Sequence, residues 1–202
     1  MLVLPACGSF GSPAATVNGV AISQDELARQ LNAVLLQPQF AQQVTGPTGA
    51  ERRRQLARQL LAFLIRQQVL VDYAERAGIH VASEAVDAQL AQVVQQSGGR
   101  RRFDEELRKS GLTESDVRTN IENAILAQRV QDQVVAQRGG PSGSDAQAVQ
   151  ARTKIFSDWL NEQVAKADVE VNPRYGRFDP KNGQICAVTS TEATAGCATA
   201  TP

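Results

Sequence analysis

A short segment near the N-terminus, Ala15–Glu26, constrains the fold of this chain more than any other. It joins an apolar strand to an Asn-Gly turn and a second strand-like step, directly before a helix start. Ser23 and Glu26 have the S-x-x-E spacing of a capping box, which marks that start. Because an isolated two-stranded ribbon is only marginally stable in water, the strand needs a partner from another part of the chain.

That partner is predicted in the second half of the sequence. Val169–Asn172 is the comparable β-rich run, and it follows a long helical pattern. We therefore expect Ala15–Val20 to pair with Val169–Val171 in a small two-stranded element. The two ends of one folded module should then meet, although more than a hundred residues separate them.

The composition argues against several function classes. The chain has 21 Lys and Arg against 21 Asp and Glu, so its formal net charge is zero. Its aromatic residues are 6 Phe, 1 Trp and 2 Tyr, which makes nine. Nucleic-acid binding depends on a basic surface and on stacking side chains, and neither is indicated here. No run of about 18 or more apolar residues occurs, so no transmembrane helix is expected.

The first thirteen residues are similar to a processed export signal. Leu4-Pro5-Ala6 precedes Cys7, as in a bacterial lipobox, where the cysteine becomes the lipid-bearing N-terminus. The match departs from the pattern, since a basic region is absent and the apolar stretch is short. Lipidation of Cys7 would make this an exported protein of the cell envelope, anchored to the outer face of the bacterial cell membrane. The alternative is a disordered apolar start with a stray thiol.

The other two cysteines lie in the C-terminal tail. Cys186 and Cys197 are close enough in sequence for a loop to join them. If Cys7 carries lipid, these two are free to form a disulfide in an oxidising compartment. The alternative is two exposed and unpaired thiols on the tail, residues 172–202, which has lost its apolar periodicity and is expected to pack loosely or to be disordered.

The central part of the chain is predicted to be helical. Apolar residues recur at helical spacing, with Gly or Pro between the periodic stretches. In the longest stretch, Leu60, Phe63, Leu64 and Leu70 belong to an apolar stripe that is wide enough to be buried. Residues 38–49 are read as a loop. The predicted helices cover about 23–37, 50–77, 83–97, 102–110, 113–137 and 145–166.

This order of elements resembles the N-terminal module of the SurA family of exported foldases, which is related to the PrsA and PpiD types and more distantly to trigger factor. Thr16–Gly19 opens the likeness, and the long helix that ends at Ala77-Gly78-Ile79 continues it. The Gly98-Gly99 break and Gly111-Leu112-Thr113 follow in the same order. The similarity covers roughly residues 14–137, and it implies a mainly α-helical module.

The resemblance also implies an omission. In that family the chain leaves the helical module, forms one or two parvulin-type isomerase domains, and returns with a helix and a strand. Residues 145–171 are similar to the returning piece, but only seven residues, 138–144, stand where the isomerase would be inserted. A domain needs about 50 residues or more. The prediction is one chaperone module over 14–171 without isomerase activity.

Catalytic and metal-binding chemistry is not indicated. Parvulin-type sites use paired histidines, whereas this chain has one, His80, with no Cys or second His near it to complete a set. We expect no enzyme activity, no metal and no cofactor. Two basic runs, Arg52–Arg54 and Arg100–Arg102, are read either as a solvated face or as contacts to anionic lipid headgroups or wall polymers. Tyr175 and Phe178 are expected to dock the chain end on the module.

These observations lead to a functional expectation. We expect an ATP-independent chaperone that binds unfolded exported polypeptides through apolar side chains between its helices. The alternative is a structural or adaptor envelope lipoprotein with one specific protein partner. The client and the oligomeric state are left open. The candidate client contacts, any of which can instead belong to the core, are Leu36, Phe40, Phe103, Leu107 and Leu112.

Overall fold

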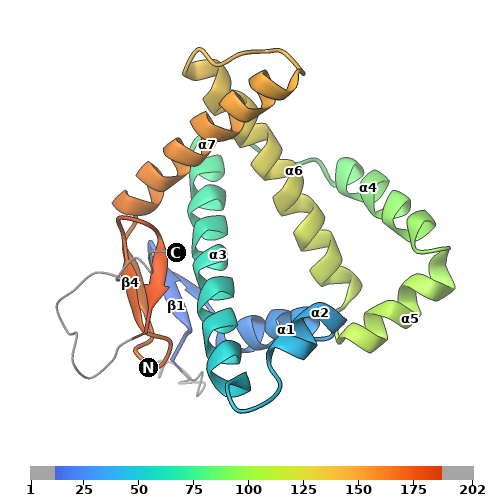
Figure 1. Ribbon diagram of the computed structural model, residues 1–202. Coiled ribbons are helices and arrows are strands. Elements are labelled where there is room, and N and C mark those ends of the chain that lie inside the picture. Colours follow the sequence, from blue (N-terminus) through green and yellow to red (C-terminus); the bar gives the residue numbers. More distant parts are fainter. Residues whose placement is uncertain (1–11, 188–202) are drawn as a thin grey trace, which may run out of the picture.

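The computed structural model describes residues 12–187 of the 202-residue chain. Helices dominate this range, which confirms the predicted mainly α-helical fold (Figure 1). The helices are α1 (Gln24–Leu35), α2 (Pro38–Gln43), α3 (Gly49–Arg76), α4 (Ser83–Gln96), α5 (Arg100–Ser110), α6 (Glu114–Gln137) and α7 (Ala146–Lys166). The strands are β1 (Ala15–Val17), β2 (Val20–Ile22), β3 (Val169–Val171), β4 (Arg177–Asp179) and β5 (Gln184–Cys186).

The N-terminal strand pairs with the distant strand, as the sequence predicts. In the sheet order β2-β1-β3, both pairings are antiparallel, and Thr16 lies opposite Glu170. The expected two-stranded element is in fact three-stranded, because the chain reverses at Asn18-Gly19 and β2 pairs with the other edge of β1. Asn18 has a φ of 49° and Gly19 a φ of 85°, the left-handed geometry that such a turn requires.

Asn18 joins three parts of the fold. Its backbone N–H donates to the Asp168 carbonyl, and its side-chain oxygen accepts from the Asp168 N–H at 3.0 Å. Its side-chain amide donates to the Asp72 carboxylate of α3 at 2.7 Å. The turn is thereby tied both to the start of β3 and to the longest helix, so this residue helps to set the position of the sheet against α3.

The sheet, α1 and α3 enclose the first core cluster. Leu61 and Ile65 of α3 and Val17 of β1 are all fully buried there. Leu61 and Ile65 are four residues apart on α3, so both lie on the face of this helix that covers the sheet. Burial of side chains of this size contributes roughly 1.5–3 kcal/mol each. At the N-terminal end of α1, the Ser23 hydroxyl accepts from the Glu26 N–H at 3.0 Å, as the capping pattern predicts.

The segment after β3 is folded on the module up to Ala187, which corrects the expectation of a loose tail there. Strands β4 and β5 form a hairpin that packs on α3, where Ile185 is buried and Arg66 donates to the Asn182 carbonyl at 2.7 Å. Tyr175 and Phe178 pack against the same core, so their predicted docking role is confirmed. Periodicity misses this hairpin because each of its strands has three residues.

Helices α3, α6 and α7 meet at one end of the module around a second cluster. Trp159 of α7 is buried and contacts Tyr73 edge to face, with ring centroids 4.6 Å apart. Leu126 and Val130 of α6 join this cluster. From here α3 and α6 diverge, and α1 and α2 lie near the far end of the gap in the ribbon view (Figure 1).

An arm of α4 and α5 packs beside the N-terminal half of α6 (Figure 1). Its core contains Val86 and Leu90 of α4, Phe103 of α5 and Ile121 of α6. Thr113 begins α6 with a complete capping box, in which its hydroxyl and backbone N–H exchange hydrogen bonds with Asp116. The hydrogen bonds from the Thr113 backbone and then its hydroxyl lower the pKa of Asp116.

Two local predictions are wrong. Residues 38–43 form the short helix α2 instead of a loop, because Pro38 occupies the first helical turn, where its missing N–H costs nothing. Ser83, at the start of a helical pattern, is predicted from its residue type to be an N-cap, but it lies inside α4 and the extended residue Ala82 takes the N-cap position. The first difference adds a short helix and the second shifts a cap by one residue, and the order of the long helices is unchanged.

The bridging role of Asn18 predicts a graded loss of stability. Asn18→Gly keeps the left-handed turn but removes both side-chain hydrogen bonds, so we expect a loss of about 1 kcal/mol in the free energy of unfolding. Asn18→Ala also forces an alanine into the left-handed conformation, so the free energy of unfolding should fall by about 2 kcal/mol. Urea unfolding measures both. Asn120→Ala, at an exposed position of α6, should change stability by less than about 0.5 kcal/mol. An unaltered Asn18→Gly variant would refute the bridging role.

The capping box predicts a pH-dependent contribution. A carboxyl with a lowered pKa stabilises the fold above its unfolded pKa of about 3.9, and this contribution is lost as the pH falls through the folded value. Asp116→Ala should therefore lower stability by about 1 kcal/mol at pH 7. The difference from the natural protein should narrow below about pH 4. Urea titrations at several pH values test this, and a difference independent of pH contradicts it.

Candidate functional site

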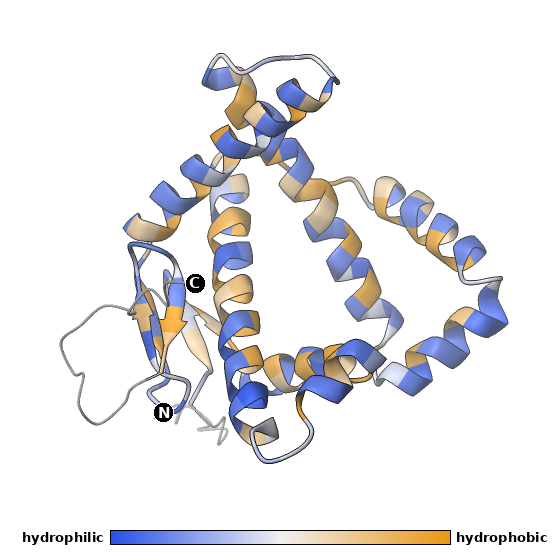
Figure 2. Ribbon diagram, in the orientation of Figure 1, coloured by the Kyte–Doolittle hydropathy of each residue, from blue (hydrophilic) through white to orange (hydrophobic). Residues whose placement is uncertain are grey.

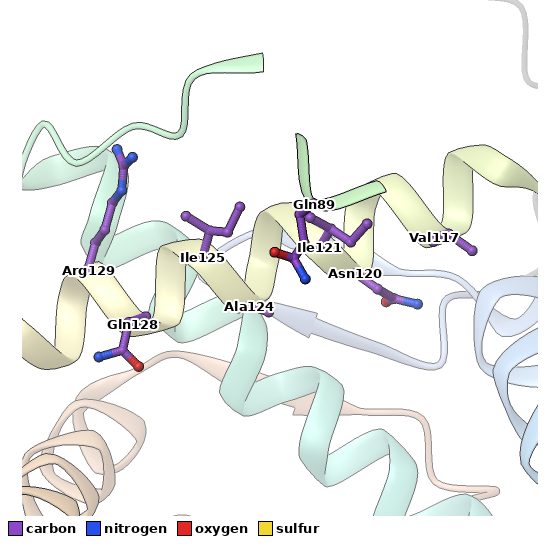
Figure 3. Close-up of a pocket in the computed structure, with 8 residues that line it drawn as sticks. All are labelled: Gln89, Val117, Asn120, Ile121, Ala124, Ile125, Gln128 and Arg129. Carbon is purple, nitrogen blue, oxygen red and sulfur yellow. The ribbon is translucent and has the colours of Figure 1, made fainter. Parts of the chain in front are cut away.

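An open groove runs along the N-terminal half of α6. It encloses about 600 Å³, and seven of its eight lining residues come from α6 (Figure 3). Its apolar part is formed by Val117, Ile121 and Ile125, which recur every four residues on one face of the helix. We call this feature the α6 groove; its lining residues are Gln89, Val117, Asn120, Ile121, Ala124, Ile125, Gln128 and Arg129.

The groove exists because α6 packs against two neighbours, α3 and the arm of α4 and α5, with two different faces. Leu126 and Val130 point to α3, whereas Ile121 packs in the arm with α4 and α5. Gln89 contributes to the groove from α4, next to Ile121 (Figure 3). Val117 and Ile125 are partly buried against the arm core and keep some surface in the groove. The result is a strip of accessible apolar surface on a well-packed helix.

The polar residues of the groove suit weak contacts to a peptide backbone. Asn120 and Gln128 are exposed amides that can donate and accept, and the Gln128 amide donates to Asp132 at 3.1 Å. Arg129 closes one end and donates to the His80 backbone carbonyl. His80, the one histidine of the sequence, is exposed in the link before α4 and is thus tied to the groove by its backbone.

Phe63 is an exposed aromatic residue that the sequence assigned to a buried stripe. It precedes Leu70 by seven residues, about two helical turns, so the two share one face of α3. Leu70 is buried in the cluster that contains α6 residues, but 58% of Phe63 is exposed. Helices α3 and α6 diverge with distance from that cluster (Figure 1). The apolar stripe on α3 therefore extends beyond the part of α3 that α6 covers, and this leaves the Phe63 side chain accessible.

The five predicted client contacts do not form one surface. Leu36 is 57% exposed after α1, and Phe40 of α2 is partly exposed. Phe103 is only 3% exposed and belongs to the arm core, with Leu107 packed against it, so Phe103 cannot contact a client. Leu112 lines a separate small pocket between α1 and α6. The candidate contacts were predicted from their positions along the helices, and such a position does not tell an exposed side chain from a buried one.

Sequence reasoning missed the α6 groove because it predicts that the whole apolar face of this helix is buried; that face is marked by Val117, Ile121, Ile125, Val130 and Val134. The signal was the length of that stripe, since Val117 to Val134 extends over about five turns of helix. A single neighbouring helix that crosses at an angle cannot cover so long a stripe. The arm covers part of it, and the groove is the remainder.

No group of three or more His, Cys, Asp or Glu side chains among residues 12–187 is arranged to hold a metal ion. None of the helices described is both long and apolar enough to span a bilayer. Figure 2 shows polar and apolar residues alternating along every long helix. Cys186 is disulfide-bonded, while Cys7 and Cys197 lie outside the described residues. The predicted Cys186–Cys197 pairing and Cys7 lipidation therefore stay predictions.

Comparison with known proteins agrees with this architecture. The model of the SurA-like N-terminal domain family matches residues 5–131, which run from before β1 into α6. Chaperone SurA of Chromobacterium violaceum is 30% identical over 132 residues. The alignment covers 65% of this chain and 30% of that relative, so the shared part is less than a third of the relative's length. The chain belongs to the SurA-like N-terminal domain family.

Proposed function

We propose that this protein is an ATP-independent chaperone that binds unfolded polypeptides and lacks peptidyl-prolyl isomerase activity. The observation that carries the proposal is the α6 groove, an open apolar strip with amide groups along its edge. An extended chain of varied sequence can place apolar side chains on such a strip and hydrogen-bond to the amides. An open groove also lets varied clients leave, which a deep and rigid pocket does not. Family membership supports the same function.

The short connection between α6 and α7 supports the absence of an isomerase domain between them. Helix α6 ends at Gln137, and the Asp145 carboxylate caps α7 by accepting from the Ala148 N–H at 3.0 Å. Gly139 turns the chain with a φ of 66°, and α6 and α7 then pack together. The connection is therefore a turn between two packed helices, and it has no room for an inserted domain.

We further propose that the protein acts outside the cell membrane. The disulfide at Cys186 favours an oxidising compartment, because cytosolic thiols are kept reduced. A lipid on Cys7 would anchor the module at the outer face of the membrane. Ser12, the first described residue, is five residues from Cys7, which spans at most about 18 Å when extended. The module would then be held close to the bilayer and to newly exported chains.

Aggregation of an unfolded client tests the chaperone function. The protein should suppress the aggregation of a chemically unfolded exported protein, measured by light scattering, and should leave the rate of a proline-limited refolding reaction unchanged. Ala124→Glu adds a charge to the α6 groove and should reduce suppression severalfold. Ala91→Glu, at an exposed position on α4 about 200° around the helix from Gln89, should not.

The possible outcomes separate the proposals. Isomerase turnover would contradict the omission of that activity. Equal suppression by Ala124→Glu and the natural protein would show that clients bind elsewhere. If no client is protected, and a pull-down from envelope extract returns one protein, the chain is an adaptor with a specific partner.

Intact-mass measurement tests the cysteine proposals. Protein made from its natural reading frame in its own host should carry a diacylglyceryl adduct on Cys7. It should also lack two hydrogens in a fragment that contains Cys186 and Cys197. An unmodified Cys7 would remove the lipid anchor, and a disulfide that links Cys186 to Cys7 would contradict both cysteine proposals.

A further inference from the structure

A second concavity lies between α1 and α3 and shares no lining residue with the α6 groove. It encloses about 430 Å³. The chain after β3 completes it with Arg174 and Tyr175. We call it the arginine pocket; its lining residues are Gln24, Leu27, Ala28, Leu31, Ala50, Arg53, Arg54, Ala57, Arg58, Arg174 and Tyr175.

The floor of the arginine pocket is apolar. Leu27 and Leu31 of α1 are four residues apart and share the face that packs on α3, where Ala57 is small enough to leave space. All three are at most 8% exposed, so the floor is part of the packed core. Tyr175 contributes an aromatic ring at one end. A bound group that reaches the floor must therefore be apolar.

The rim of the pocket is cationic and largely unneutralised. Arg53 donates to the Asn32 side-chain oxygen at 3.2 Å, and Arg174 donates to the Gln24 side-chain oxygen at 2.6 Å. Both of these acceptors are neutral amides. Neither guanidinium forms an ion pair with a carboxylate among residues 12–187.

The other two rim arginines share a single carboxylate. Arg54 and Arg58 both pair with Glu51, at 2.7 and 2.9 Å, and these hydrogen bonds, Arg58's first, lower the pKa of Glu51. Four arginines thus line the pocket, and among residues 12–187 Glu51 is the one carboxylate that forms an ion pair with any of them, in a chain that is neutral as a whole.

Two arginines of the second basic run are paired with carboxylates, in contrast to Arg53 and Arg174. Arg100 pairs with Asp104 at 3.0 Å and with Glu114 at 2.6 Å, and Arg101 pairs with Glu105 at 3.5 Å. The pair of Arg100 with Glu114 joins α5 to the start of α6, whereas the other two pairs lie within α5. Arg100 and Arg101 therefore differ from Arg53 and Arg174, which have no ion pair among residues 12–187.

We propose that the arginine pocket binds the C-terminal end of an unfolded polypeptide, with the terminal carboxylate paired to one of the two rim arginines that lack an ion pair, Arg53 or Arg174, and the last apolar side chain on the floor. Guanidinium groups bind carboxylates through paired hydrogen bonds, and recognition of a chain end by its carboxylate is an established mode of peptide binding. This inference rests on the proposed chaperone function and names a part of the client.

The shape of the pocket favours a chain end over a membrane. A flat layer of lipid headgroups would contact the rim and leave the apolar floor unfilled. A volume of about 430 Å³ holds one or two side chains, and the pocket is open enough for the rest of a chain to leave it. A fatty acid offers the same carboxylate and an apolar body, so the experiment must distinguish it from a polypeptide.

Matched peptides test the inference. A fluorescent octapeptide that ends in Phe-Leu is made with a free carboxylate and, separately, with an amidated end, and its binding is measured by anisotropy at constant salt. The free acid should bind about tenfold more tightly than the amide, because charged hydrogen bonds depend on the carboxylate. Arg53→Gln with Arg174→Gln should abolish that preference.

The control variant matches the charge removed. Arg52→Gln with Arg101→Gln also removes two exposed arginines, but neither residue lines the pocket, and this variant should keep the tenfold preference. Circular dichroism and the aggregation assay verify that both variants fold and function. Loss of the preference in the control variant would show that only the overall charge matters, and would overturn the inference.

Three further results would overturn it. Equal affinity for the free acid and the amide rejects the carboxylate and leaves the proposed chaperone function intact. Decanoate that displaces the peptide at lower concentrations than unlabelled free-acid peptide would identify a fatty-acid site. Failure of both peptides to bind rejects the inference alone if aggregation is still suppressed, and the proposed function fails only if that suppression is also absent.

Discussion

The antiparallel pairing of β1 with β3 is the interaction on which the rest of the structure depends. It joins Ala15–Val17 to Val169–Val171, and through Asn18 it also ties the sheet to α3. Neither strand is stable alone, because three residues cannot form a sheet in water without packing. Their pairing places both ends of the helical module against the same core. The helices α1 to α7 must therefore start and end at the same small sheet.

That closure explains why the module tolerates a short connection between α6 and α7. The two helices pack on α3 around Trp159, so their positions are set by the second core cluster and by β3, which follows α7. The segment that connects α6 to α7 has little influence on that packing. A turn of eight residues between Gln137 and Ala146 is sufficient here. The binding surfaces of the module lie elsewhere, on α6 and between α1 and α3.

Both candidate surfaces result from helices that meet at one end and separate at the other. Where α3 and α6 are in contact, Leu70 is buried; farther along α3, Phe63 is exposed. The arm of α4 and α5 covers only part of the apolar face of α6, and the α6 groove is the uncovered remainder beside α4. Small residues such as Ala57 leave space between α1 and α3, where the core continues into the arginine pocket. The apolar surface for binding is thus an extension of the packed core.

The sequence by itself determined the order of the long helices, the Asn18-Gly19 turn, the capped helix starts and the need for a distant partner strand. These features depend on local chemistry, on periodicity, and on the instability of a lone strand. The fate of individual apolar side chains was decided by the tertiary structure. Phe103 became core, Phe63 became exposed, and Ile185 was buried by a hairpin of two three-residue strands. Helical spacing places a residue on a face, but burial depends on how far a neighbouring element extends along that face. Likewise, the sequence predicts the i,i+4 pairs of Arg100 with Asp104 and of Arg101 with Glu105, but only the tertiary structure brings Arg174 to the same pocket as Arg53.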